Sequence, residues 1–208
     1  MSSSASAGDA EFLRSAFREL HGPRLHGFAL LVALGDARRA ERAAAQALGA
    51  GAKQVEILRH PERAAAWLRA RTLRDLQGRS WGGGGPTLDV RRNVLATLGT
   101  DDVAFAAMSV LSPRDRAALV ATAVEGFDPI DVETILGTNP GATRKAVVRA
   151  RTHYLDGVLS LPPGEARLVR GALSQRVREV VARALGTTED EEPGPVQRRR
   201  RTRDRSAQ

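Results

Sequence analysis

The amino-acid sequence predicts an all-α protein, and two observations carry that prediction. Alanine, leucine, valine and arginine dominate the composition, whereas alternating runs rich in valine, isoleucine and threonine are absent. Apolar residues also recur at helical spacing along most of the chain. With 208 residues, the chain is long enough for one large or two small helical domains.

A first helical domain is predicted over residues 9–77. Asp36 can cap one of its helices, and Pro61 suits the first turn of another. The four expected helices span residues 9–20, 25–34, 37–48 and 61–76. The residues expected to face the core are Phe12, Leu13, Ala16, Phe17 and Leu20 in the first helix, and Ala65, Leu68, Thr72 and Leu76 in the fourth.

Residues 78–100 are predicted to be a flexible linker between two domains. The run from Gly82 to Gly85 has nothing to bury and has maximal backbone freedom. A phosphate-binding loop is not favoured, because no Lys-Ser or Lys-Thr pair follows the glycines.

In the second domain, residues 101–158, the same two-residue motif occurs at three predicted helix starts. An N-cap residue, whose side-chain oxygen can accept from a free backbone N–H, is followed by a proline that has no N–H to satisfy. The three pairs are Ser112-Pro113, Asp128-Pro129 and Asn139-Pro140. Three helix starts are thereby predicted.

A further helix is expected within residues 159–186, and residues 187–208 are expected to be a disordered basic tail. The helix could cover the linker, dock a partner or pair with its copy in a dimer. Its apolar stripe comprises Val169, Leu173, Val177, Val180 and Ala184, and Gly186 is the expected C-cap. The tail contains an acidic run followed by arginines.

The second domain contains the pattern of a helix-turn-helix unit. Only residues 137–139 separate its second and third capped helices, and a short turn with glycine sets two helices at a steep angle. On a helical wheel, the segment 141–155 has one apolar face, made of Thr143, Val147, Ala150 and Tyr154. The opposite face carries Lys145, Arg149 and Thr152 and is flanked by Arg144 and Arg151. Such a face suits phosphates and base edges in the DNA major groove.

The charge of the chain agrees with a polyanionic partner. The formal net charge is +8, and it comes from arginine, since Lys53 and Lys145 are the only lysines. Codon usage in a GC-rich genome explains the arginine count by itself equally well.

Several classes of function are not expected from this sequence. The chain has no cysteine, and its histidines at positions 21, 26, 60 and 153 form no helical i, i+4 pair, so no metal site and no cofactor are predicted. The carboxylates are interpreted as caps and solvated ion pairs rather than catalytic residues, so an enzyme is not predicted. No signal peptide and no apolar run of about 20 residues is evident, which predicts a cytoplasmic protein without membrane insertion.

Residues 111–155 contain an ordered set of short motifs: 111–116 (LSPRDR), 125–127 (EGF), 131–132 (DV), 135–137 (ILG), 141–145 (GATRK) and 149–151 (RAR). In this order and spacing, they resemble the C-terminal, promoter-recognising domain of extracytoplasmic-function sigma factors of bacteria. The resemblance implies that the last helix binds the minus-thirty-five promoter element and that Arg144, Lys145, Arg149 and Arg151 contact phosphates or bases. The sequence departs from the family pattern at Glu133 and Ala146.

The first domain is similar to the helical domain with which the same family binds RNA polymerase and opens the promoter. Gly35-Asp36, Ala40-Glu41 and Trp67-Leu68 occur in the family's order, which implies that Asp36 and Glu41 contact polymerase. The departures from the family pattern are Arg42, the displaced Gln46 and the segment 72–75. The family also holds an unstacked DNA strand with aromatic residues. Here Phe12, Phe17 and Phe28 are expected in the core, whereas Trp67 suits either role.

The resemblance implies a sigma factor whose partners are promoter DNA and core RNA polymerase, with an anti-sigma factor as a further possible partner. A second hypothesis is a sigma-like regulator that binds DNA without opening promoters. A third is a helical adaptor that binds only proteins. Salt-sensitive binding to duplex DNA separates the first two hypotheses from the third.

Overall fold

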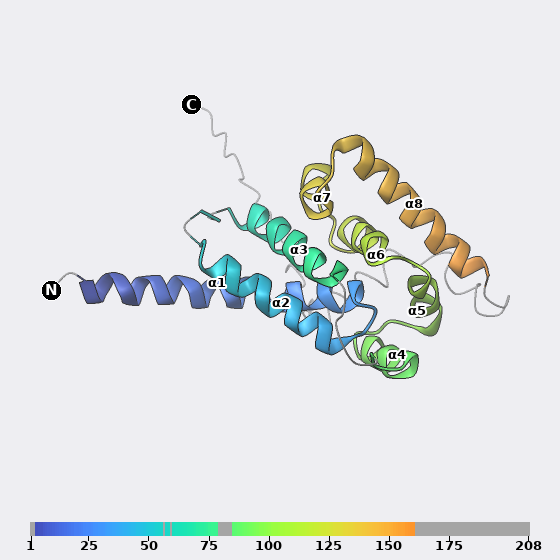
Figure 1. The fold of residues 1–208 in the computed structure, drawn as a ribbon, viewed down its shortest axis with the longest axis horizontal. Coiled ribbons are helices and arrows are strands. Elements are labelled where there is room, and N and C mark those ends of the chain that lie inside the picture. Colours follow the sequence, from blue (N-terminus) through green and yellow to red (C-terminus); the bar gives the residue numbers. More distant parts are fainter. Residues whose placement is uncertain (1–2, 56, 59, 79–84, 161–208) are drawn as a thin grey trace, which may run out of the picture.

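The computed structural model describes residues 3–55, 57–58, 60–78 and 85–160, and every regular element in them is helical (Figure 1). No strand occurs in this part of the chain, which confirms the all-α prediction. The helices are α1 (Ser3–Val32), α2 (Ala37–Ala52), α3 (Pro61–Gln77), α4 (Leu88–Thr97), α5 (Asp102–Ser109), α6 (Pro113–Leu119), the π-helical segment η1 (Val120–Val124), α7 (Pro129–Leu136) and α8 (Pro140–Leu159). The predicted C-terminal helix and tail and Gly82 to Gly84 lie outside the described residues.

The first two predicted helices are one continuous helix, α1, which includes Pro23. The proline removes one backbone hydrogen bond and crowds the carbonyl group one turn before it. The helix continues because residues after the proline, including Leu25 and Phe28, are buried and α1 packs on α2 and α3. The first half of α1 projects from the body of the protein (Figure 1). Phe17 is buried there, but the predicted inward orientation is wrong for Phe12, Leu13, Ala16 and Leu20, which are exposed.

The predicted starts of the next two helices are confirmed. The Asp36 carboxylate accepts the Arg39 N–H at 3.1 Å and caps α2, and Pro61 occupies the first turn of α3. Buried alanines along α2 allow a close approach to α1. The predicted inward residues of α3 are Leu68, Thr72 and Leu76, all buried, and Ala65, which is half-buried. Trp67 is half-buried and packs against the core.

The second part of the predicted linker is a helix, α4, capped by Thr87. It packs on the first half of the chain: the Arg91 guanidinium lies 3.6 Å from the Asp36 carboxylate. The Arg91 carbonyl oxygen would lie 2.2 Å from a Cβ atom added at Gly35, whose φ is +72°. Only glycine fits this turn, because any side chain would clash and would also be strained.

The three proline-started helices of the second half begin as predicted. The N–H groups of Asp115, Asp131 and Ala142 donate to the side chains of Ser112, Asp128 and Asn139 at 3.1, 2.9 and 2.9 Å. These caps satisfy donors that have no partner inside their helices.

The two predicted domains pack directly on each other and share one hydrophobic core. Helix α3 lies against α7, and α1 lies against α6 and η1. In Figure 1, the first three helices accordingly lie beside the α6–α8 group.

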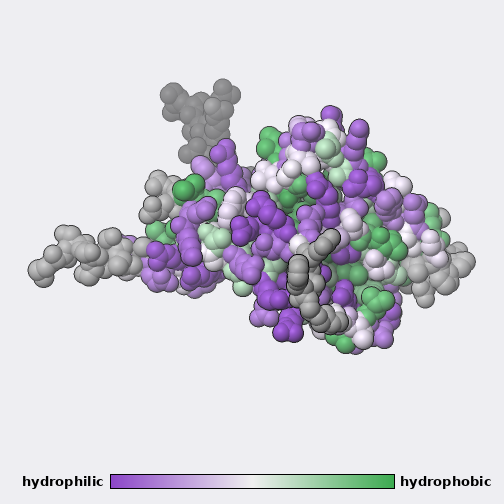
Figure 2. Space-filling model, viewed as in Figure 1, coloured by the Kyte–Doolittle hydropathy of each residue, from purple (hydrophilic) through white to green (hydrophobic). Residues whose placement is uncertain are grey.

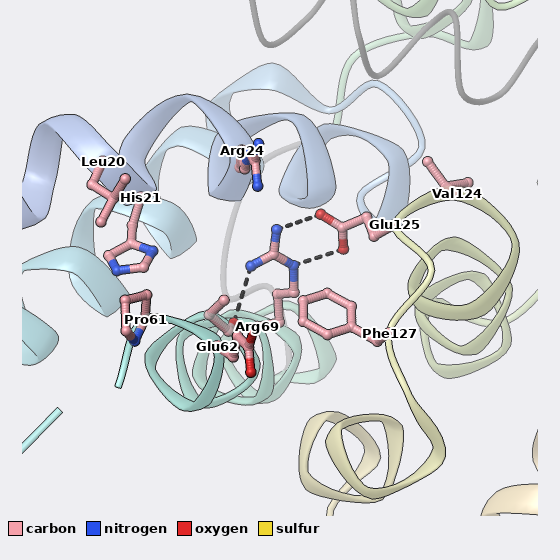
Figure 3. Close-up of a pocket in the computed structure, with 10 residues that line it drawn as sticks. Leu20, His21, Arg24, Pro61, Glu62, Arg69, Val124, Glu125 and Phe127 are labelled. Atoms are coloured by element: carbon pink, nitrogen blue, oxygen red, sulfur yellow. Dashed lines mark hydrogen bonds and ion pairs between the residues drawn. The ribbon is translucent and has the colours of Figure 1, made fainter. Parts of the chain in front are cut away.

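Two buried arginines, which we call the arginine clasps, join the halves. The first is Arg69 of α3, whose guanidinium forms a bidentate pair with Glu125, including a contact of 2.6 Å from Nε to Oε2. Figure 3 shows this guanidinium between Glu125 and the ring of Phe127. It lies 4.8 Å from the ring centre of Phe127 and 5.6 Å from that of Phe28. Burial of a charge costs much less free energy when the group is hydrogen-bonded, and here the guanidinium also has a carboxylate partner.

The second clasp is Arg116 of α6, a buried residue of the second half whose guanidinium donates to the first half. Its Nε donates to the Val32 carbonyl at the end of α1 at 2.7 Å, and its Nη1 donates to the Leu111 carbonyl at 2.6 Å. Burial and the nearby Arg91 and Arg39 lower the pKa of Arg116 to about 10, so the group stays charged at neutral pH.

We expect Glu125→Gln to destabilise both halves together. Removing one partner of a buried ion pair costs about 3–5 kcal/mol. Trp67 of α3 packs against the core, so in a Trp81→Phe background its fluorescence reports the first half during urea unfolding. In Glu125→Gln, the midpoints of the tryptophan fluorescence transition and of the helical circular dichroism transition should both shift to lower urea concentration. The control Glu19→Gln, on the exposed part of α1, should shift neither midpoint. An unchanged tryptophan transition in Glu125→Gln would show that the halves unfold independently.

Candidate nucleic-acid interface

The turn between α7 and α8 is fixed by backbone geometry. Gly137 adopts a left-handed conformation with φ of +61°, and the Thr138 N–H donates to the Glu133 carbonyl at 3.1 Å. This arrangement ends α7 within one residue and turns the chain sharply. From α6, the Arg114 Nη2 donates to the Leu136 carbonyl at 3.0 Å and so binds the end of α7.

The start of α8 is equally well defined. The Asn139 side chain accepts from Ala142, and the hydroxyl oxygens of Thr138 and Thr143 lie 2.9 Å apart. Each residue of the turn is hydrogen-bonded, and residues 137–139 alone separate α7 from α8. This is the short connection that the predicted helix-turn-helix unit requires.

The inner face of α8 packs against α5 and α6. Thr143, Ala150 and Tyr154 are buried as the wheel predicts, and Val147 is half-buried. Burial, together with the Asp101 carboxylate, raises the pKa of Tyr154 to about 12. Ala146 is also buried, so the departure from the family pattern at that position removes no surface contact.

The outer face of α8 carries the five predicted DNA contacts, all of them exposed: Arg144, Lys145, Arg149, Arg151 and Thr152. Arg144 and Lys145 lie in the first two turns of the helix. Figure 2 shows hydrophilic and hydrophobic residues mixed over the part of the surface where Figure 1 places α8. The structure therefore brings these cationic groups together on one accessible helix face.

Arg149, the fifth predicted contact, has a partner within the protein. Its Nη2 and Nε lie 2.6 and 3.0 Å from Oδ1 of Asp115 in α6, and 47% of its side chain is exposed. Burial acts to raise the pKa of Asp115, but hydrogen bonds from Arg149 and Ser112 outweigh it, and the pKa lies below its ordinary value. Arg149 therefore orients α8 on α6, in addition to any contact with DNA.

The two predicted polymerase contacts lie far from this face in the chain and differ in accessibility. Asp36 is 3% exposed, and its carboxylate is used as a helix cap and as the partner of Arg91. Glu41 is exposed on α2. Of the two, only Glu41 presents its carboxylate to solvent.

Sequence reasoning missed an apolar stripe on the outer face of α8. Val148, Leu155 and Leu159 are 63%, 53% and 62% exposed. They are spaced by seven and four residues and hence lie in line along the helix. We call these three residues the outer stripe. The spacing was visible in the sequence, but their exposure depends on which face of α8 packs inward.

Comparison with known proteins identifies no relative: no protein-family model, no curated protein and no solved structure matches this chain. Among the described helices, none has the length and apolar character needed to cross a membrane. The described residues also contain no group of three histidine or acidic side chains placed to hold a metal ion.

We expect the contact between Asp115 and Arg149 to stabilise the fold in a pH-dependent way. The folded pKa of Asp115 is lowered, so its contribution is present above the ordinary value of 3.8 and is lost as the pH falls through the folded value. Asp115→Asn should therefore lower the free energy of unfolding by roughly 1 kcal/mol at pH 7. The difference from the original protein should shrink below pH 3.8, as measured by thermal unfolding. A difference that stays constant down to pH 2.5 would contradict this role.

Proposed function

We propose that this protein is a sigma factor that directs core RNA polymerase to promoters and contacts duplex DNA through α8. The observation that carries the proposal is the three-residue, hydrogen-bonded turn between α7 and α8, after which α8 exposes Arg144, Lys145 and Arg151 to solvent. The family-like order of motifs in residues 111–155 supports the same assignment. The protein would work in the cytoplasm and would itself make or break no covalent bond.

The position of the cations on α8 supports this proposal. In helix-turn-helix proteins, residues in the N-terminal part of the second helix reach the base edges. Arg144 and Lys145 occupy that part of α8, beside a helix terminus that favours phosphate. Arginine can bind guanine with two hydrogen bonds, and an aliphatic side chain such as Val148 can contact a thymine methyl group.

A second candidate function is a DNA-binding regulator that does not open promoters. The observation that favours it lies in the first half, where the Asp36 carboxylate is buried and α3 is covered in part by α7. Surfaces needed for polymerase binding and for strand separation would then be reduced.

Transcription reconstituted from purified components separates these functions. The full-length protein is combined with core RNA polymerase and fragmented genomic DNA from the source organism, and transcript starts are mapped. Discrete starts with a shared upstream motif are expected for a sigma factor. Retention of duplex DNA without transcripts selects the regulator, and failure to bind any duplex even at low salt selects a protein-binding adaptor.

We expect Arg144→Ala and Lys145→Ala to weaken binding to the recovered promoter by about 1–3 kcal/mol for each residue that contacts a base. Both residues are exposed, so the helical circular dichroism should not change. Arg38→Ala on α2 removes an equal charge from another exposed site and is the matched control. Equal losses for Arg38→Ala and the α8 variants, measured by fluorescence anisotropy, would show that only net charge matters.

A further inference from the structure

The outer stripe of α8 is an apolar surface that the described part of the chain leaves uncovered. Its three aliphatic side chains are each more than half exposed and lie in line along about three turns of helix. Isolated exposed aliphatic residues are ordinary, but an aligned set on one helix face is typical of a contact surface. The outer stripe is therefore expected to be a binding surface for another segment or molecule.

The outer stripe runs through the middle of the candidate DNA-binding face. At 100° per residue, Arg144 and Arg151 lie on one side of it, and Lys145 and Thr152 lie on the other. A helix packed on the stripe would consequently cover the groups proposed to contact DNA.

We propose that residues 165–185 of the same chain pack antiparallel along the outer stripe. They follow the end of α8 after only residues 160–164, and a connection this short makes successive helices antiparallel neighbours. The segment has an apolar stripe of its own in the sequence. That stripe comprises Val169, Leu173, Val177, Val180 and Ala184.

The lengths of the two segments agree. As a helix, the 21 residues of 165–185 would extend about 31 Å, and the 20 residues of α8 extend about 30 Å. Packed antiparallel, the segment would return to the first turns of α8. In this register, Leu173 lies near Leu155, and residues 177–180 lie near Val148.

The acidic residues that follow the segment are complementary in charge to the start of α8. The acidic run Glu189 to Glu192 comes soon after the segment and would reach Arg144 and Lys145 at the start of α8. Opposite charges would thus meet where the proposed DNA phosphates bind. The segment itself carries five arginines and two glutamates, so its own net positive charge repels the cations of α8 and weakens the packing.

The consequence is a protein that occludes its own DNA-binding face until DNA or another partner displaces residues 165–192. This consequence rests on the proposed function of α8, whereas the packing itself does not. The experiment accordingly has one part without DNA and one part with it.

The packing is tested by cysteine crosslinking of the full chain, which has no native cysteine. Leu155→Cys with Leu173→Cys should give an intramolecular crosslink with a short bismaleimide in the monomeric fraction. Phe12→Cys with Leu173→Cys, which joins the segment to the exposed part of α1, should not. Leu155 and Phe12 are exposed, so neither change disturbs the core. Crosslinks only between two molecules, or equal yields for the two pairs, would overturn the proposal.

The occlusion is tested by the affinity for one fixed DNA duplex at constant salt. Changing the four residues of the acidic run to their amides should tighten binding by about fivefold or more relative to a matched control. The control changes four exposed acids far from α8, Asp9, Glu11, Glu19 and Glu41, to amides and raises the net charge equally. Equal affinities of the two variants would overturn the occlusion. If no variant binds DNA but the crosslink forms, the packing stands and the proposed function fails.

Discussion

The charged pair of Arg69 and Glu125, buried beside the rings of Phe28 and Phe127, determines how the two halves of the chain meet. A guanidinium removed from water needs a carboxylate in the right place, and only one arrangement of α3 and the loop before α7 supplies it. The π-helical segment η1 contributes to this placement, since Glu125 follows it directly and its N–H bonds to Val120 within the wider turn. The packing of α7 on α3, and so the position of α8, follows from this contact.

Arginine has a second structural use in this protein, as a cap for the carbonyl ends of helices. Arg116 binds the end of α1, Arg39 donates to Leu76 near the end of α3, and Arg114 binds the end of α7. A cation at these ends satisfies carbonyls that lack a partner and interacts favourably with the helix dipole. Part of the arginine excess is thus explained by the fold, without reference to nucleic acid. The exposed cations of α8 belong to a different group, because among them only Arg149 has a hydrogen bond to another helix in the described residues.

The shared core also bears on the proposed function. Because α3 and α7 bury each other's surfaces, a polymerase that needs those surfaces would have to separate the halves and expose both clasps. The outer face of α8 needs no such change, since it points away from α5 and α6. The proposed DNA binding by α8 would therefore leave the fold unchanged, whereas polymerase binding by the first half would require the two halves to separate.

The helix starts and the turn before α8 were predictable from sequence because their causes are local: a capping side chain, a proline and a glycine within a few residues. The same local reasoning assigned Arg144, Lys145, Arg151 and Thr152 to an exposed helix face. Local reasoning failed where contacts between residues far apart in the chain determine the structure. Pro23 is tolerated because α1 packs on α2 and α3, and α4 forms in an expected linker, where it packs on α5 and approaches Gly35. Asp36 and Arg149 acquire their partners from α4 and α6, and such pairings exist only after the chain has folded.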